Sequence, residues 1–383
     1  MIPNEVYSQT ILGFLAPVRT YLQDVGVSEI MINGPSQIVI ERAGRLENTS
    51  ARFESSEAIL CALRNVAQFT GKRFDELNPI LEARLPDGSR LEAVIPPITP
   101  DGPCVAIRRF SRESLDLTHL VRSGSLTEVA AEALSVLVQG KLNMIIAGGT
   151  GSGKTSLLNV LTGFAPETDR IIVIEDSKEV QVQRPHVVSM EARPADEHGQ
   201  GAVSIRDLFR ATLRMRPDRI IIGEIRGAEA LDIVQAMVSG HGGCMGTLHA
   251  TYPRDTLTRL ETMAMMSDVN MPLTALRMQI ASGVNVIVQV TRMQDGSRAV
   301  SHITEVLGFD TQSSRYQLRD LFVRKLLGVA ADGTLRSELV PAGALPSFMP
   351  QLRERGLDLP VAMYTCARES EAAHAKDQNI CNA

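Results

Sequence analysis

The feature that most restricts the fold of this chain is a glycine-rich segment, GGTGSGKT, at residues 148–155. It follows an apolar run at residues 142–147, which predicts a buried strand, and it leads into a stretch with helical character at residues 156–162. Glycine tolerates backbone angles that other residues avoid, so the N–H groups of such a loop can close around phosphate oxygens at the helix N-terminus. The spacing GxxxxGK followed by Thr, in this context, predicts a nucleotide phosphate loop rather than an incidental glycine-rich turn.

The members of this loop have expected parts in binding ATP and Mg²⁺. Lys154 is expected to reach the β- and γ-phosphates, and the hydroxyl of Thr155 is expected to help hold Mg²⁺. The remaining members are expected to line the nucleotide, largely through their backbone: Gly148, Gly149, Thr150, Gly151, Ser152 and Gly153.

Two acidic residues follow predicted buried strands and are candidates for the chemistry at this loop. Glu175 follows residues 171–174, and Glu224 follows residues 220–222 with one glycine between. The carboxyl ends of parallel strands meet at one edge of an open sheet, beside the phosphate loop. We therefore expect Glu224, with Glu175, to position metal and water, and Glu224 to be the metal ligand; which of the two is the base stays open. The alternative for Glu175 is that it caps the next turn.

Two arginines are further candidates near the predicted Glu224 strand. Arg210 lies on a basic face of the helix predicted at residues 204–215, and Arg226 follows the strand directly. Each is expected either to orient an acid or bind phosphate, or to belong to a solvated basic surface.

Two histidines flank a predicted strand at residues 244–248, within a glycine-rich segment. They are His241 and His249. Their spacing and the lack of nearby acids do not suit zinc. We expect a role in sensing the γ-phosphate, in particular for His249, which lies at the end of the strand on the catalytic edge.

Composition excludes several other classes of protein. The chain has 39 basic and 44 acidic residues and no tryptophan, which disfavours a protein whose main task is to coat nucleic acid. Its five cysteines form no CxxC, which favours a reducing compartment. No apolar run approaches the roughly 18 residues that cross a bilayer, and the start lacks a basic leader. These features predict a cytoplasmic protein without a membrane-spanning segment.

The pattern along the chain predicts two domains. Residues 1–110 alternate short strands with one helix and indicate a small α+β domain, and residues 111–125 are polar and indicate an interdomain linker. Residues 126–330 alternate helices with short apolar strands, which is typical of an α/β fold with a parallel sheet covered on both faces. Residues 331–383 indicate a C-terminal extension with a mobile end.

Together these segments resemble the secretion ATPase superfamily of type II secretion, type IV pili and type IV secretion. Three segments are similar to its Asp, Walker B and His boxes: IEDSKE at 174–179, LRMRPDRIIIGEIRG at 213–227 and GHGGCMGTLHA at 240–250. Three others look like its tight-adherence (Tad) pilus branch of the CpaF type: ARLPDGSRLEAVIPP at 83–97, AIRRF at 106–110 and QIASGVNVIVQVTR at 279–292.

This resemblance implies a homo-hexameric ring whose subunits have an N-terminal PAS-like domain and a RecA-like ATPase domain, with the nucleotide between them. It also implies that arginines of the N-terminal domain reach the nucleotide. The matching positions are Arg84 and Arg90 on a predicted hairpin, and Arg108 and Arg109 on the next strand. A guanidinium there would stabilise charge on the transferred phosphoryl group. The implied partners are polytopic inner-membrane platform proteins, through which the protein would associate peripherally with the membrane.

The sequence thus predicts an ATP-hydrolysing motor that powers Tad or type IV pilus assembly, or protein secretion across the cell envelope. A conjugation or type IV secretion ATPase is the alternative within the superfamily, because the motor boxes do not identify the cargo. A RecA- or helicase-like motor would share the chemistry but need a basic, aromatic-rich strand-binding surface. A nucleotide-bound scaffold with little turnover would not need the two strand-end acids.

Overall fold

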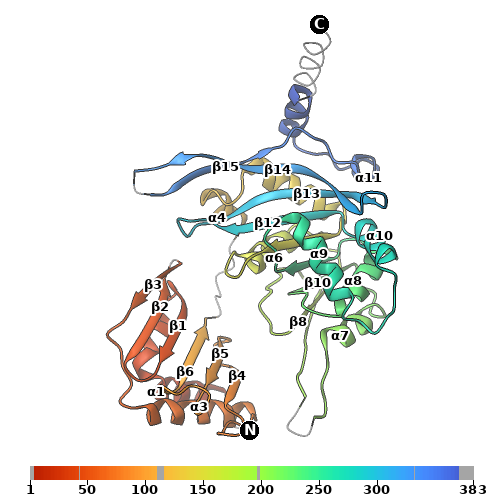
Figure 1. Cartoon of the computed structure of the whole chain (residues 1–383). Coiled ribbons are helices and arrows are strands. Elements are labelled where there is room, and N and C mark those ends of the chain that lie inside the picture. Colours follow the sequence, from red (N-terminus) through yellow and green to blue (C-terminus); the bar gives the residue numbers. More distant parts are fainter. Residues whose placement is uncertain (1–3, 43, 110–115, 196–198, 332, 371–383) are drawn as a thin grey trace. The chain divides into compact units, whose positions relative to one another are not determined.

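Hydrophobic side chains of the described residues gather into three cores, and each core draws on one part of the chain only. One takes its buried residues from between Ile11 and Ile107, and the other two take theirs from between Leu120 and Met363. The chain accordingly divides into two units, Met1–Glu113 and Ser114–Ala383 (Figure 1). The computed structural model describes residues 4–42, 44–109, 116–195, 199–331 and 333–370.

The first unit is an antiparallel sheet with helices packed on it. Its six strands have the order β3-β2-β1-β6-β5-β4. The strands are β1 (Val27–Asn33), β2 (Gln37–Arg42), β3 (Arg45–Asn48), β4 (Ile80–Arg84), β5 (Arg90–Val94) and β6 (Cys104–Arg108). The helices are α1 (Asn4–Phe14), η1 (Ala16–Val18), α2 (Arg19–Gln23) and α3 (Ser56–Thr70). Alternate strand residues such as Ile30 and Ile32 are buried in one core with Ile59 and Leu63 of α3, because successive side chains of a strand point to opposite faces.

The second unit is a nine-stranded sheet with the order β15-β14-β13-β12-β7-β11-β10-β8-β9. The strands are β7 (Met144–Gly148), β8 (Ile171–Glu175), β9 (Val187–Glu191), β10 (Arg219–Ile222), β11 (Met245–Leu248), β12 (Val286–Arg292), β13 (Arg298–Asp310), β14 (Arg315–Val329) and β15 (Leu335–Pro341). The pairs from β12 to β9 are parallel, and β12 to β15 form antiparallel pairs. The order reverses at β7, the strand that leads into the glycine-rich loop.

Helices cover both faces of the parallel part of this sheet. They are α4 (Leu117–Arg122), α5 (Glu128–Gln139), α6 (Lys154–Thr162), α7 (Ile205–Thr212), α8 (Glu229–Val238), α9 (Pro253–Ala264), α10 (Leu273–Gly283) and α11 (Met349–Glu354). Met144 and Ile146 of β7 pack in one core with α5 and α6, whereas Ile145 and Ala147 pack in the other with α8 and α9. Figure 1 shows α8, α9 and α10 together over one face. The predicted α/β fold with a doubly covered parallel sheet is confirmed.

The boundaries between segments differ from the expectation. Residues 111–115 of the expected linker lie outside the described residues, and the remainder of it contains α4, which is capped by Asp116 and buries Leu120. The expected extension begins inside the second unit, because β15 pairs with β14 and buries Leu339, and α11 buries Leu352. Its expected mobile end, residues 371–383, lies outside the described residues. No helix in the part of the chain that the structure describes has the length and apolar character needed to cross a membrane.

Candidate nucleotide-binding site

The glycine-rich loop joins the end of β7 to the start of α6. Gly151 and Gly153 have φ angles of 68° and 96°, a region that side chains rarely adopt, and Gly153 is the N-cap of α6. Gly148 is enclosed, because a Cβ there would collide with the carbonyl oxygen of Val290 and lie 2.5 Å from Oγ of Ser152. The Ser152 hydroxyl donates to the carbonyl oxygen of Gly149 (2.8 Å), which closes the loop on itself. The sequence therefore builds a tight loop at a helix N-terminus, the form that binds phosphate.

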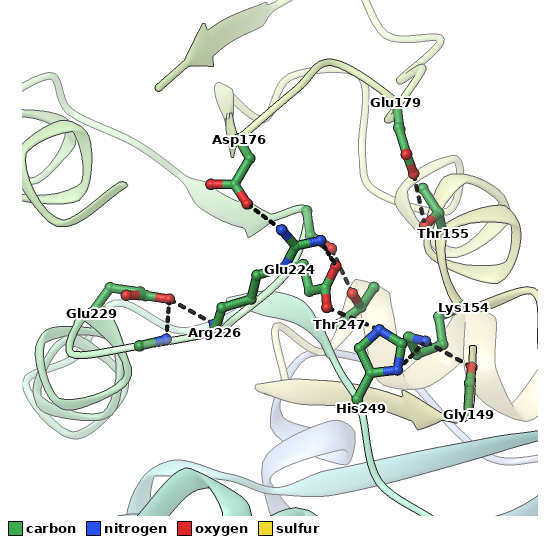
Figure 2. Close-up of polar contacts among 12 residues, drawn as sticks. Gly149, Lys154, Thr155, Asp176, Glu179, Glu224, Arg226, Glu229, Thr247 and His249 are labelled. Atoms are coloured by element: carbon green, nitrogen blue, oxygen red, sulfur yellow. Dashed lines mark hydrogen bonds and ion pairs between the residues drawn. The ribbon is translucent and has the colours of Figure 1, made fainter. Parts of the chain in front are cut away.

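Three polar side chains, those of Lys154, His249 and Glu224, contact one another in turn at this loop (Figure 2). Lys154 Nζ donates to the carbonyl oxygen of Gly149 (2.9 Å) and lies 3.3 Å from Nδ1 of His249. Nε2 of the same ring lies 2.9 Å from Oε1 of Glu224. With Nδ1 accepting from the ammonium group, Nε2–H donates to the carboxylate, so the ring has one defined tautomer.

The other oxygen of Glu224 is held by Arg226. Nη2 of Arg226 lies 2.6 Å from Oε2 of Glu224, and Nη1 lies 2.9 Å from Oδ2 of Asp176. The backbone N–H of Arg226 donates to Oε1 of Glu229 (2.7 Å), at the start of α8 (Figure 2). The strand-end acids and the loop lysine are thus joined through His249 and Arg226.

These contacts shift the acidity of two groups. Burial raises the pKa of the Glu224 carboxyl, but the hydrogen bond and charge of Arg226 outweigh this, and the pKa lies below its ordinary value. Burial and then the positive charge of Lys154 lower the pKa of His249, against the opposing charge of Glu224. At neutral pH the site therefore holds an ionised Glu224 beside a neutral imidazole.

A second carboxylate lies at the hydroxyl of Thr155. Oε2 of Glu179 is 3.4 Å from Oγ1 of Thr155 (Figure 2). Glu175, which ends β8 and is buried, turns its Oε1 toward the backbone N–H groups of Glu179 and Val180, both at 2.9 Å. Glu175 thereby shapes the loop that brings Glu179 to the start of α6.

The strand ends pack closely enough to fix these positions. A Cβ on Gly223 would lie 2.6 Å from Cγ of Glu175, so only glycine fits between β8 and Glu224. The hydroxyl of Thr247 donates to the carbonyl oxygen of Gly223 (2.5 Å), which ties β11 to β10 at the same edge. Because the strands are parallel, their carboxyl ends all face the loop.

Comparison with known proteins now decides the family. Residues 14–318 match the family described as Type II/IV secretion system protein. The chain belongs to this family.

Named members of the secretion family share much of the chain. Conjugal transfer protein TrbB of Rhizobium radiobacter is 32% identical over 300 residues, which cover 77% of this chain and 88% of TrbB. Type IV secretion system protein VirB11 of Bartonella henselae is 31% identical over 320 residues, covering 74% of this chain and 90% of VirB11. The superfamily expected from the sequence is confirmed, and the Tad branch within it stays a prediction.

Solved structures of secretion ATPases have the same two-domain fold. The Legionella pneumophila ATPase DotB superposes with a TM-score of 0.55 at 20% identity, over 78% of this chain and 82% of DotB. The pilus retraction motor PilT with bound ADP gives 0.51 at 17% identity, over 89% of this chain and 86% of PilT.

The structure separates the residues predicted for this secretion-family site into groups. The loop, Glu224, Arg226 and His249 come together, with Glu175 directly beside them. Arg210 does not join them: among the described residues its ion pair is with Asp232 of α8, which it shares with Arg206. This ion pair links α7 to α8, and a catalytic role of Arg210 stays a prediction.

The two histidines also separate. His249 follows β11 and lies at the phosphate loop, whereas His241 precedes β11 and so lies at the opposite edge of the parallel sheet. The expectation of γ-phosphate sensing is wrong for His241, because a strand places its two ends at opposite edges.

The arginines predicted in the first unit form a row across its sheet. Arg84 of β4 lies opposite Arg90 of β5, which lies opposite Arg108 of β6. The neighbouring Arg109 instead donates to the carbonyl oxygens of Asp24 and Val27. The row supplies three cations at one end of the sheet, and its approach to a nucleotide stays a prediction.

Two residues at the site were missed in the sequence. Glu179 lies in the IEDSKE segment at 174–179, and the sequence carries no local signal for its contact with Thr155. Gln289 of β12 is buried, and its Nε2 donates to the carbonyl oxygens of Ala250 (3.0 Å) and Thr251 (3.1 Å), directly after His249. A lone amide inside the apolar run VIVQV was its signal.

The described residues contain no group of three or more His, Cys, Asp or Glu side chains placed to hold a metal ion. Mg²⁺ in nucleotide sites is bound through one or two protein ligands together with substrate phosphates, so the pair of Thr155 and Glu179 fits it. Glu224, predicted as the metal ligand, has its two oxygens on His249 and Arg226 instead.

Proposed function

We propose that this member of the secretion family is an ATP-hydrolysing motor. The observation that supports it best is the contact chain Lys154–His249–Glu224 across a tight loop at a helix N-terminus. Phosphoryl transfer to water uses a lysine that binds the phosphates and an ionised carboxylate that can orient or deprotonate the water, and both lie here within hydrogen-bond reach of a neutral imidazole. A scaffold that only holds nucleotide has no need of this arrangement.

The residues divide the work as follows. Lys154 and the loop N–H groups bind the β- and γ-phosphates, and Thr155 with Glu179 holds Mg²⁺, which supplies a positive charge that stabilises the transferred phosphoryl group. Glu224 is the proposed base. Phosphate competes with His249 for Lys154, and His249 and Glu224 can then turn toward the attacking water.

Arginines of the first unit are proposed to complete the site. The row Arg84, Arg90 and Arg108 gives a rigid source of positive charge, since each lies on a paired strand. We propose that it clamps the phosphates, in the same or a neighbouring subunit of a hexameric ring, and couples hydrolysis to domain movement.

The work is proposed to act on Tad-type pilus assembly at the cytoplasmic face of the inner membrane, through polytopic platform proteins. The sequence segments at 83–97 and 279–292 support this branch. A conjugation or type IV secretion motor is the second candidate, because relatives carry the names TrbB and VirB11. Neighbouring genes for a prepilin peptidase and two polytopic membrane proteins would favour the pilus.

The activity is tested by measuring phosphate release from ATP and Mg²⁺. Lys154→Ala is expected to lose about a hundredfold or more, since the lysine neutralises charge that grows in the transition state. Lys325→Ala, on an exposed lysine of β14, is the matched control and should equal the parent. If Lys154→Ala hydrolysed ATP as fast as the parent, the proposal would be wrong.

A further inference from the structure

We propose that Gln289, the buried amide of β12, is a positioning residue for His249. The inference rests on the proposed function, in which His249 links Lys154 to Glu224, and it names the side chain that holds this histidine in place (Figure 2). Gln289 is 2% exposed, and it interrupts an otherwise apolar and buried run, VIVQV at residues 286–290.

The histidine lies in a short segment between two regular elements. β11 pairs with β7 as far as Leu248, and α9 begins at Pro253, so residues 249–252 belong to neither element. The position of the imidazole of His249 therefore depends on how this connecting segment is held.

The amide of Gln289 holds this segment at two points. Its Nε2 donates to the carbonyl oxygens of Ala250 (3.0 Å) and Thr251 (3.1 Å), the two residues that directly follow His249. Because only the NH₂ group of an amide can donate to both carbonyls, these contacts also define which way the amide points. Oε1 of Gln289 is buried and has no hydrogen-bond partner among the described residues. A half-satisfied amide in an apolar run costs stability, which indicates a task other than packing.

The order of the strands lets this side chain reach the segment. Gln289 lies opposite Ala147 of β7, and Ala147 lies opposite Leu248 of β11, so the three residues form one row across the sheet. Ala147 and Leu248 belong to the core that α8 and α9 cover. The small side chain of Ala147 leaves room for the longer one of Gln289 to pass over β7 toward the chain that follows Leu248.

A register shift accompanies Gln289. In the β12–β13 pair, Gln289 lies opposite His302 and Val290 lies opposite Val300, so Ser301 is an extra residue on β13. The hydroxyl of Ser301 donates to the carbonyl oxygen of Gln289 (3.3 Å). Such bulges bend a strand and redirect side chains, and they are frequent beside active sites. The bulge therefore supports a functional role for Gln289.

The test is a double-mutant cycle on ATP hydrolysis by the full chain with Mg²⁺. Gln289→Leu keeps the approximate size of the side chain and removes both hydrogen bonds, and it is expected to lower kcat about tenfold to a hundredfold. KM should change by less than about twofold, because Lys154 and the loop still bind the phosphates. The double variant Gln289→Leu/His249→Ala should have the kcat of His249→Ala alone, because a residue that acts through His249 then has nothing left to position.

Thr304→Val is the matched control. Thr304 is 1% exposed on β13, and its hydroxyl donates to Oδ1 of Asp320 (2.6 Å), so this variant also removes a hydrogen bond from a buried side chain. It should keep the kcat of the parent. If Gln289→Leu does not fold, Gln289→Asn takes its place: its amide is shorter by a methylene, it cannot reach both carbonyls, and it should show the same fall in kcat.

The outcomes separate the inference from the proposed function. If His249→Ala is slow and Gln289→Leu equals the parent, the inference alone is wrong. A double variant slower than His249→Ala by the full factor of Gln289→Leu would overturn it too, because the amide would then act by another route. So would an equal fall in kcat in Thr304→Val, which would assign the loss to a weakened core. If His249→Ala hydrolysed ATP as fast as the parent, or the parent did not hydrolyse it, the proposed function would fail and the inference with it.

Discussion

At the scale of single residues, the site contains two carboxylates with different environments. Glu175 is buried, and its Oε1 accepts hydrogen bonds from two backbone N–H groups. Glu179 is half-buried and lies at the Thr155 hydroxyl. The first environment fixes a loop, and the second leaves a carboxylate beside the hydroxyl that is proposed to bind Mg²⁺. Substitution of the two residues should therefore have different effects: one on activity and the other on stability.

We expect Glu179→Gln to lower Mg²⁺-dependent ATP hydrolysis about a hundredfold with little change in stability, because an amide is a poor ligand for a hard cation. Glu175→Gln is expected to lose about 1–3 kcal/mol of unfolding free energy, because its hydrogen bonds lose their charge. Magnesium titrations of ATPase rate and urea denaturation measure the two effects. The reverse pattern would show that Glu175 is the metal ligand.

His249 should make stability depend on pH. Its pKa in the folded protein lies below the unfolded value near 6.5, so between the two values the unfolded chain binds more protons. Stability is therefore full above the unfolded pKa near 6.5, and it falls as the pH drops from that value toward the folded pKa. Melting temperatures in EDTA from pH 7.5 to 5 should fall less steeply in His249→Ala than in the parent.

His119, an exposed histidine of α4, provides the control for this measurement. His119→Ala should keep the slope of the parent. Equal slopes for the parent and His249→Ala would contradict the neutral imidazole.

The sequence predicts those site residues that have a recognisable pattern in the residues next to them in the chain. Lys154 and Thr155 follow a glycine pattern, and Glu224 follows an apolar strand, so each has a local signal. The ion pair of Arg210 has no such signal, because its partner, Asp232, comes from another helix. The contact of Glu179 with Thr155 depends on how a loop folds back, which no spacing rule describes.

At the scale of elements, the buried parallel strands were predictable and the antiparallel ones were less so. β7, β8 and β10 are apolar at every position or nearly so, because both faces are covered. Most residues of β14 and β15 are exposed or half-buried, and only Leu321, Phe322 and Leu339 are buried, so the periodicity of these strands is weak. That weakness explains why the sequence predicts an extension at the end of the second unit.

The contact between β7 and β12 leads to a prediction for Gly148. Gly148→Ala places a methyl group against the carbonyl oxygen of Val290, which should separate the two strands and cost about 1–3 kcal/mol. It should also weaken nucleotide binding, because the loop starts there. Gly149→Ala is the matched control, since nothing lies within 4 Å of a Cβ at that position. Urea denaturation of both variants measures this loss of stability. Equal denaturation midpoints for the two variants would contradict the close approach of Gly148 to Val290.

At the scale of the whole molecule, the separate cores of the two units predict two unfolding transitions. Calorimetry of the full chain should resolve them, and ATP with Mg²⁺ should raise the transition of Ser114–Ala383 by about 2.7 kcal/mol at a hundred times Kd. The fragment 1–113 should fold alone and reproduce the other transition. A single transition for the whole chain would contradict the independence of the cores.

The central position of β7 also has a consequence for how the protein is made. Asn143 and Asn285, 142 residues apart, are joined by a hydrogen bond at the start of the β7–β12 pair. The first unit can fold as soon as it leaves the ribosome, but an apolar β7 must wait for most of the remaining chain before its second neighbour exists. The glycine-rich loop can thus take its final form only after β12 has been synthesised, and the proposed nucleotide site forms after that point.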